Sequence, residues 1–213
     1  MLTIHHLGKS QSERVVWLCE ELGIPYELKI HTRDPVTMLA PPSMKALHPM
    51  GTGPVMADGD MVMTESGAIV EYIIDKYGNG RLKLRPDHPD FAQYLYWFHF
   101  ANASLQAVMG RNMVVRRLAP PDDNPVKVGT LERLDRALRF MDTRLATNEY
   151  LAGSEFTAAD IMSVFSVTTM RYFYPADLTP YPNIRAWLKR VAAREAYQRA
   201  MKKGDPDMPL LLD

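Results

Sequence analysis

Three polar residues, Thr64, Glu65 and Ser66, directly precede a run of apolar residues with the spacing of one helical face. Polar residues at such a position usually cap the helix. The free N–H groups and the positive end of the helix dipole also suit a carboxylate ligand. The segment therefore predicts either ordinary caps or a binding site for an anionic group.

The residues before this helix would form a tight corner beside it. The turn at 51–54 has the sequence Gly-Thr-Gly-Pro, which can contain a cis peptide bond. Two short apolar segments, 55–57 and 61–63, are joined by Asp58-Gly59, a pair that favours a tight hairpin. The order of these features, a turn, then a hairpin, then a polar helix start, is stronger evidence for an anion-binding site than any one of the three features alone.

This stretch resembles the cytosolic glutathione transferases in its Gly-x-x-Pro-Val turn, Asp-Gly hairpin and Glu-Ser-x-Ala-Ile-x-x-Tyr segment. Together with the later segment Gly-x-x-Phe-Thr-x-Ala-Asp-Ile, the resemblance covers nearly the whole chain. In that family the proline is cis, the preceding residue pairs with the cysteinyl part of glutathione, and the Glu-Ser pair holds the γ-glutamyl end. The resemblance implies that the glutathione-binding residues are Thr52, Gly53, Pro54, Glu65 and Ser66.

The resemblance further implies a bacterial or fungal type of enzyme with a serine-type active site, which favours the thiolate of glutathione. Ser10 stands a few residues before Arg14-Val15, about where serine-type members place the catalytic hydroxyl, and Ser12 is the second candidate. Ser10-x-x-Glu13 is also a capping box, and Ser12 could be a plain cap. In a third interpretation neither serine contacts the sulfur, and a backbone amide stabilises it instead.

The sequence departs from the family pattern at two positions of the turn. Thr52 stands where many members have Lys, and Gly53 stands where they have Val, Ile or Ser. The basic residue that meets the glycine carboxylate of glutathione has no clear counterpart, and Lys45 and Arg33 are candidates by proximity. We therefore do not expect tight glutathione binding from the sequence alone.

The segments around this stretch predict an α/β N-terminal domain. Segments 2–7 and 25–30 alternate as strands around a helix at 10–21 that Gly23 ends, which favours a parallel strand pair. With a short helix at 43–47, the order is β-α-β-α-β-β-α, that of a thioredoxin-like domain. We expect this domain to span residues 1–78.

A linker over 79–89 and an all-α domain over 90–213 complete the expected fold, which is glutathione transferase-like. A long helix over 91–117, bent near Gly110, begins the second domain. Thr157-x-x-Asp160 is a capping box before an apolar helix that we expect at the centre of that domain. The substrate pocket is expected between the domains, lined by Tyr94, Phe98, Met109, Arg111 and Met113.

Composition excludes several other classes of protein. The 213 residues have a formal net charge of +0, which does not indicate a nucleic acid partner. No apolar run is long enough for a membrane span, and the first residues alternate as in a strand rather than a signal peptide, so we expect a cytoplasmic protein with no membrane partner. The single cysteine, Cys19, lies in an apolar helical stripe and should be packed and inert, and the histidines have no metal-ligand spacing.

The leading hypothesis is a homodimeric glutathione transferase that acts in detoxification. The thiolate of the co-substrate glutathione, formed without the help of a metal, would attack a small hydrophobic electrophile. One alternative is a glutathione-dependent peroxidase or disulfide reductase, although the absence of a catalytic cysteine disfavours the cysteine-type reductases. The other is a non-catalytic interaction module with the same fold.

Overall fold

The computed structural model describes residues 1–213, which pack into two compact units. The first unit comprises Met1–Lys83 and Ala192–Leu210, and the second comprises Leu84–Val191 and Leu211–Asp213. The expected boundary between domains is close to that between the units at Lys83. The C-terminal segment Ala192–Leu210, which the sequence placed in the helical domain, packs instead with the first unit.

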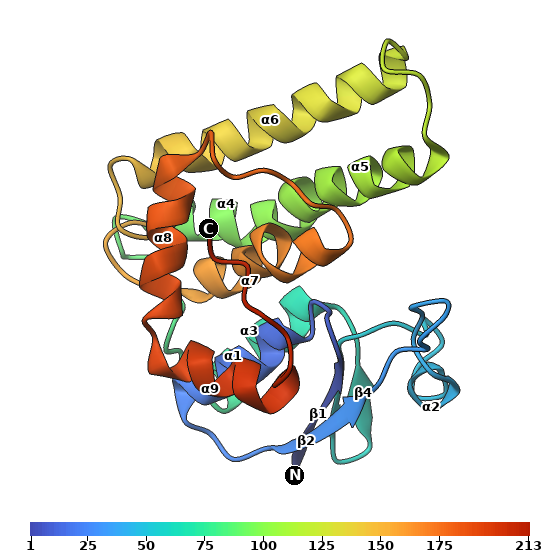
Figure 1. Ribbon diagram of the computed structural model, residues 1–213. Coiled ribbons are helices and arrows are strands. Elements are labelled where there is room, and N and C mark those ends of the chain that lie inside the picture. Colours follow the sequence, from blue (N-terminus) through green and yellow to red (C-terminus); the bar gives the residue numbers. More distant parts are fainter. The chain divides into compact units, whose positions relative to one another are not determined.

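The first unit contains a four-stranded sheet in the order β2-β1-β3-β4. Strand β1 (Leu2–Leu7) runs parallel to β2 (Glu27–His31) and antiparallel to β3 (Val55–Asp58), which forms a hairpin with β4 (Met61–Met63). All six residues of β1 are buried, as expected for a central strand. The predicted parallel pair and hairpin are confirmed, and Figure 1 shows the strands together in one sheet.

Helices α1 (Glu13–Leu22) and α2 (Pro42–Lys45) connect strands, and α3 (Ser66–Lys76) follows β4, which completes the predicted thioredoxin-like order. Gly23 ends α1 in a left-handed conformation with φ of 63°, where glycine carries no steric penalty. Cys19 is fully buried on α1, and burial raises the pKa of its thiol to about 12. The prediction of a packed, unreactive cysteine is therefore confirmed.

Asp58, at the end of β3, holds the hairpin against the far end of α3. One of its carboxylate oxygens, Oδ2, accepts hydrogen bonds from Tyr72 at 2.8 Å, Lys76 at 2.7 Å and Tyr77 at 2.6 Å. These three donors, Lys76 first, hold the pKa of Asp58 well below its ordinary range. Asp58 therefore links the end of β3 to the last turn of α3.

The C-terminal helix α9 (Glu195–Gly204) packs along α1, and Figure 1 shows the two side by side. Arg194 binds Glu21 through two hydrogen bonds of 2.7 and 2.8 Å, and the rings of Trp17 and Tyr197 meet at 4.9 Å. A forked guanidinium–carboxylate pair combines charge with fixed geometry. These contacts explain why residues 192–210 belong to the first unit although they are helical.

The second unit is helical throughout, as predicted. Its elements are α4 (Phe91–Phe100), a π-helix η1 (Ala101–Gln106), α5 (Ala107–Leu118), α6 (Pro125–Leu145), α7 (Ala158–Val167), a 3₁₀ turn η2 (Thr169–Tyr172) and α8 (Pro182–Ala192). The long first segment departs from α-helical geometry at η1 rather than at Gly110, where a bend was expected. Helices α5 and α6 pack side by side (Figure 1). No helix of the protein is both long and apolar enough to span a bilayer.

Helix α7 is the buried centre of this unit, and all ten of its residues are buried. Its predicted capping box is confirmed: Thr157 accepts from the Ala159 amide, and Asp160 accepts from the Thr157 amide at 3.0 Å. Asp160 also accepts from the Leu151 amide at 3.0 Å and from the Trp187 indole at 2.9 Å. Burial raises the pKa of Asp160 to about 6, against the effect of these donors.

We expect Asp160→Asn to destabilise the protein by roughly 2–4 kcal/mol, because the amide group turns an N–H toward donors that need an acceptor. Urea unfolding followed by circular dichroism measures this loss. Asp123→Asn, at an exposed aspartate of the same unit, is the matched control and should stay within about 0.5 kcal/mol of the parent protein. Equal stability of the two variants would contradict the role assigned to Asp160.

Candidate functional site

The turn before β3 has the predicted cis peptide bond, between Gly53 and Pro54. A Cβ atom on Gly53 would lie 2.7 Å from the terminal methyl group of Met44 and 3.3 Å from Cβ of Leu7. Met44 is fully buried on α2 and occupies the space that a larger residue at position 53 would need. The departure from the family pattern at Gly53 is therefore matched by the packing of Met44.

The start of α3 lacks the side-chain cap that a polar residue usually provides at a helix N-terminus. Glu65 is the N-cap residue, but its side chain makes no capping hydrogen bond and is exposed. Its φ of 70° lies in the left-handed region, which non-glycine residues rarely adopt and which is concentrated at functional sites. The side chain of Glu65 therefore does not provide the ordinary cap that one of the two sequence interpretations predicts.

A buried arginine connects this helix start to α1. Arg14 is fully buried, and its Nη1 donates to Oε1 of Gln11 at 3.0 Å and to Oγ of Ser66 at 3.1 Å. Gln11 in turn donates to the carbonyl of Gly53 at 3.2 Å. Burial lowers the pKa of Arg14 to about 9, which leaves the guanidinium charged at neutral pH. The starts of α1 and α3 and the cis-prolyl turn therefore form one hydrogen-bonded group.

The sequence interpretation missed the part played by Gln11 and Arg14. The sequence pattern gives Arg14 no role beyond its place after the two serines, and it gives Gln11 none. The available signal was an arginine directly before the apolar run that begins at Val15, because a guanidinium buried there requires acceptors close by.

Both candidate serines lie at the start of α1, and neither forms the capping box with Glu13. Ser12 is the N-cap residue without a side-chain capping bond, and the Glu13 amide bonds the backbone carbonyl of Ser10 at 3.1 Å. The two hydroxyl oxygens are 2.7 Å apart, and Oγ of Ser12 accepts from the Leu7 amide at 3.0 Å. Ser12 is 0% exposed and Ser10 is 5% exposed. Ser10 is thus the more exposed residue of the two.

The two basic candidates for a carboxylate ligand have different surroundings. Arg33 donates to the carbonyl oxygens of Gly8 at 2.7 Å, Lys9 at 3.1 Å and Met38 at 2.7 Å, so it holds the loop before Ser10 in place. Lys45 is exposed on α2, and its side chain reaches the turn at Gly51. Of the two, Lys45 is the one that can bind an incoming carboxylate without breaking backbone hydrogen bonds.

The five residues predicted for the substrate pocket do not share one environment. Tyr94, Phe98 and Met109 are buried, and the rings of the first two pack at 5.8 Å. Arg111 is exposed and Met113 is half-buried on α5. The structure therefore makes Tyr94, Phe98 and Met109 core residues, since aromatic residues and methionines along a helix serve packing first.

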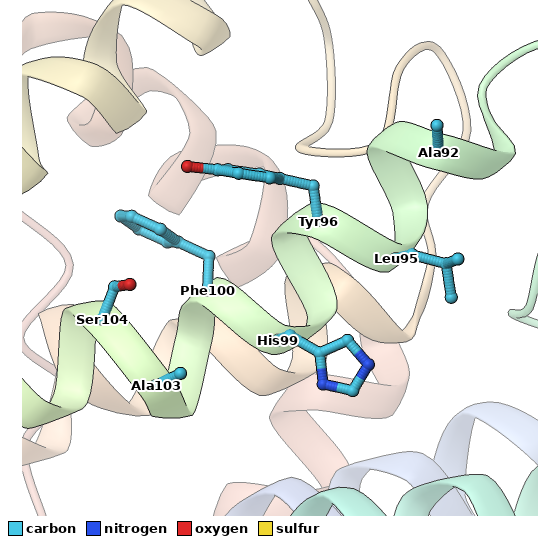
Figure 2. A pocket seen from close by; sticks show the side chains of 7 residues that line it. All are labelled: Ala92, Leu95, Tyr96, His99, Phe100, Ala103 and Ser104. Carbon is cyan, nitrogen blue, oxygen red and sulfur yellow. The ribbon is translucent and has the colours of Figure 1, made fainter.

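A cavity of ≈ 470 Å³ on α4 and η1 is lined by none of these five residues. Figure 2 shows that Tyr96 and Phe100 extend to one side of the helix, and Leu95 and His99 to another. The rings of Tyr96 and Phe100 are stacked at 6.0 Å. The remaining lining residues are Ala92, Ala103 and Ser104. This exposed apolar face follows the same helical turns whose buried residues were predicted to bind substrate.

Comparison with known proteins agrees with these observations. Residues 6–81 match the family profile "Glutathione S-transferase, N-terminal domain", and residues 106–195 match "Glutathione S-transferase, C-terminal domain". Glutathione S-transferase 3 of Schizosaccharomyces pombe is 34% identical over 95% of this chain and 88% of its own, and glutathione S-transferase 3 of Zea mays is 30% identical over 88% and 87%.

Two solved structures are similar in fold. A glutathione S-transferase from Actinobacillus pleuropneumoniae superposes with a TM-score of 0.88 at 30% identity, over 96% of this chain and 93% of its own. A glutathione transferase from Phanerochaete chrysosporium, solved with oxidized glutathione, has a TM-score of 0.75 at 25% identity, over 95% and 94%. Both likenesses extend over the two units of the chain.

We expect Arg14→Met to destabilise the protein by roughly 3–5 kcal/mol, because it removes the cation beside the buried carboxyl of Glu13 and leaves acceptors without a donor. Urea unfolding measures the change. Arg133→Met is the matched control at an exposed arginine of α6 and should lie within about 0.5 kcal/mol of the parent. A tolerated Arg14→Met change would mean that Gln11 and Ser66 are held by other contacts.

Proposed function

Because the chain belongs to the glutathione S-transferase family and is a glutathione transferase, we propose that it joins the sulfur of glutathione to a small hydrophobic electrophile. The observation that carries this proposal is the meeting of the starts of α1 and α3 with the cis-prolyl turn, through Arg14 and Gln11. Two helix starts with positive dipole ends then face a ligand that bears two carboxylates.

Glutathione would lie across this corner. The carboxylate of its γ-glutamyl end would bind the first amides of α3 and the hydroxyl of Ser66. The ammonium group of the same end would bind the exposed carboxylate of Glu65. The cysteinyl backbone would pair with Gly53, beside Thr52 and Pro54. The glycine carboxylate would reach Lys45, whose ammonium group is exposed next to the turn.

Activation of the sulfur requires a modest free energy. A free thiol with a pKa of about 8.5 is only about 3% ionised at pH 7. Lowering that pKa by about two units, equivalent to about 2.7 kcal/mol, leaves roughly three-quarters of it ionised. A hydroxyl donor to the thiolate contributes about 1.5–3 kcal/mol, and a helix N-terminus about 0.3–1 kcal/mol. Ser10 would supply the hydroxyl and the start of α1, at Glu13, the helix N-terminus, and the greater exposure of Ser10 favours it over Ser12.

The alternative activities receive less support. A cysteine-type reductase needs a reactive thiol in the protein, and the pKa of the buried Cys19 thiol is raised to about 12 by burial. A peroxidase that uses the thiolate of glutathione shares the proposed site, and an activity screen against hydroperoxides separates it from conjugation. A non-catalytic module would not need Glu65 in a strained conformation beside an uncapped helix start.

Three further properties belong to this proposal: a role in detoxification, a cytoplasmic location and a homodimer. The exposed apolar face on α4 supports the homodimer, because Leu95 and Tyr96 are 37% and 49% exposed there. Of the predicted pocket residues, Arg111 and Met113 retain accessible surface with which to meet an electrophile.

Glu65→Gln should weaken glutathione binding roughly 10- to 150-fold, since a charge-assisted hydrogen bond to the ammonium group of the ligand is worth about 1.5–3 kcal/mol. Isothermal titration calorimetry measures the dissociation constant. Glu71→Gln, on the same helix, serves as the control and should bind like the parent. Unchanged binding by Glu65→Gln would contradict this placement of the γ-glutamyl end.

Ser10→Ala should lower kcat/KM for a glutathione conjugation roughly 10- to 150-fold, because the variant loses about 1.5–3 kcal/mol of hydrogen bonding to the thiolate. The ultraviolet absorbance of bound thiolate should fall with it, while Ser154→Ala, at an exposed serine, should change neither. If Ser10→Ala and Ser12→Ala both ionise bound glutathione as well as the parent, a serine does not activate the sulfur.

A further inference from the structure

A continuous chain of hydrogen bonds leads from Ser10 into the interior of the first unit. Oγ of Ser10 lies 2.7 Å from Oγ of Ser12, which lies 2.9 Å from Nδ1 of His6. Nε2 of His6 lies 3.0 Å from Oδ2 of Asp205, which follows α9. Two hydroxyl groups, an imidazole and a carboxylate are thus arranged in series, and only the first of them is at the proposed sulfur site.

The inner members of this chain are held tightly. His6 and Ser12 are both 0% exposed. A Cβ atom on Gly204 would lie 3.0 Å from Nε2 of His6, so the end of α9 packs directly against the imidazole ring. The other oxygen of Asp205, Oδ1, accepts from the Lys9 amide at 2.9 Å. The carboxylate therefore faces the ring in one orientation.

The donors and acceptors in the chain have a defined direction. An ionised carboxylate only accepts, so Nε2 of His6 donates to Asp205 and Nδ1 is left as the acceptor. The hydroxyl of Ser12 has two acceptors within reach, Nδ1 of His6 at 2.9 Å and the carbonyl of Leu7 at 3.3 Å, and it gives its single proton to the nearer one, His6. Ser10 then gives its proton to Ser12. In this state the oxygen of Ser10 presents a lone pair to the sulfur site, which suits acceptance of a proton rather than donation.

We propose that His6 and Asp205 are positioning residues that take up the proton of the glutathione thiol through Ser12 and Ser10. This inference rests on the proposed function. The S–H bond breaks as an O–H bond forms on Ser10, the former hydroxyl proton of Ser10 passes to Ser12, and that of Ser12 passes to Nδ1 of His6. Both serines remain neutral, the thiolate and the imidazolium appear together, and nothing is oxidised or reduced.

Proton transfer reverses the hydrogen bonds that join Ser10, Ser12 and His6, while Nε2 of His6 donates to Asp205 both before and after. The imidazolium donates to Ser12, Ser12 donates to Ser10, and Ser10 donates to the thiolate. The hydroxyl that accepted the proton therefore becomes the donor that stabilises the anion. Asp205 stabilises the imidazolium through the bond to Nε2, in the way that a buried carboxylate supports the histidine of a Ser-His-Asp triad.

The chain ends near solvent at its carboxylate. Asp205 lines a cavity of ≈ 450 Å³ together with Lys9, His31, Arg33 and Asp207. These side chains, and His5, which lies 2.9 Å from His31, are charged or titratable groups beside this cavity. Burial, and then the proximity of His6, lower the pKa of His31, which favours a neutral ring there. Asp205 is therefore the member of the chain that borders this cavity.

A nuclear magnetic resonance titration of the ring nitrogens of His6 in the full-length protein tests the proposal directly. Glutathione should convert the ring from neutral imidazole to imidazolium, whereas S-methylglutathione, which has no thiol proton, should leave it neutral. A ring that stays neutral while bound glutathione ionises would overturn the proposal. If S-methylglutathione does not bind at all, the proposed glutathione site fails instead.

Asp205→Asn provides the second test. The amide group would donate to Nε2 of His6, place the ring proton on Nδ1 and prevent that atom from accepting. We expect kcat/KM to fall roughly 10- to 100-fold and the apparent pKa of the bound thiol to rise. Affinity for S-methylglutathione should change less than about twofold.

Asp207→Asn is the matched control, because Asp207 lines the same cavity and is exposed. Its kcat/KM, its bound-thiol pKa and its affinity for S-methylglutathione should match those of the parent protein.

If Asp205→Asn fails to fold, the titration of His6 in the parent protein still tests whether His6 takes up the proton. A folded Asp205→Asn variant whose pH profile for thiol ionisation matches the parent would show that the four side chains only hold the loop.

Discussion

The buried guanidinium of Arg14 is the interaction on which the ligand-binding corner depends. A charged group without water needs acceptors within hydrogen-bond distance, and those of Arg14 come from two different elements. Gln11 belongs to the turn before α1, and Ser66 is the first residue of α3. Gln11 extends the connection to the carbonyl of Gly53. The three backbone segments that would bind glutathione are therefore fixed relative to one another before a ligand arrives.

Two strained residues flank this corner, and each has a different support. Lys9 has a φ of 54° and Glu65 a φ of 70°, conformations that non-glycine residues rarely adopt. The amide of Lys9 donates to Asp205, and its carbonyl accepts from Arg33. Glu65 instead sits between the hairpin and α3, which Asp58 holds together. The contacts that support these two conformations therefore lie outside the corner.

The C-terminal segment makes the first unit more than a thioredoxin-like sheet with its helices. Helix α9 is anchored on α1 by the pair of Arg194 and Glu21, and its last residue, Gly204, allows close approach to His6. Asp205 follows directly and completes the chain of hydrogen bonds that begins at Ser10. A carboxylate from the far end of the sequence is thus brought to a histidine of the first strand.

Local sequence by itself determined the strands β1, β3 and β4, the Asp58-Gly59 hairpin, the cis-prolyl turn and the capping box of Thr157 and Asp160. Each of these depends on neighbouring residues with few conformational choices, so a short pattern carries the information. Tertiary structure alone decided that Ser10 and Ser12 do not cap α1, that Tyr94 is a core residue, and that Asp205 meets His6. Those outcomes depend on which distant groups compete for the same hydrogen bond or the same volume, and a local pattern does not encode that competition.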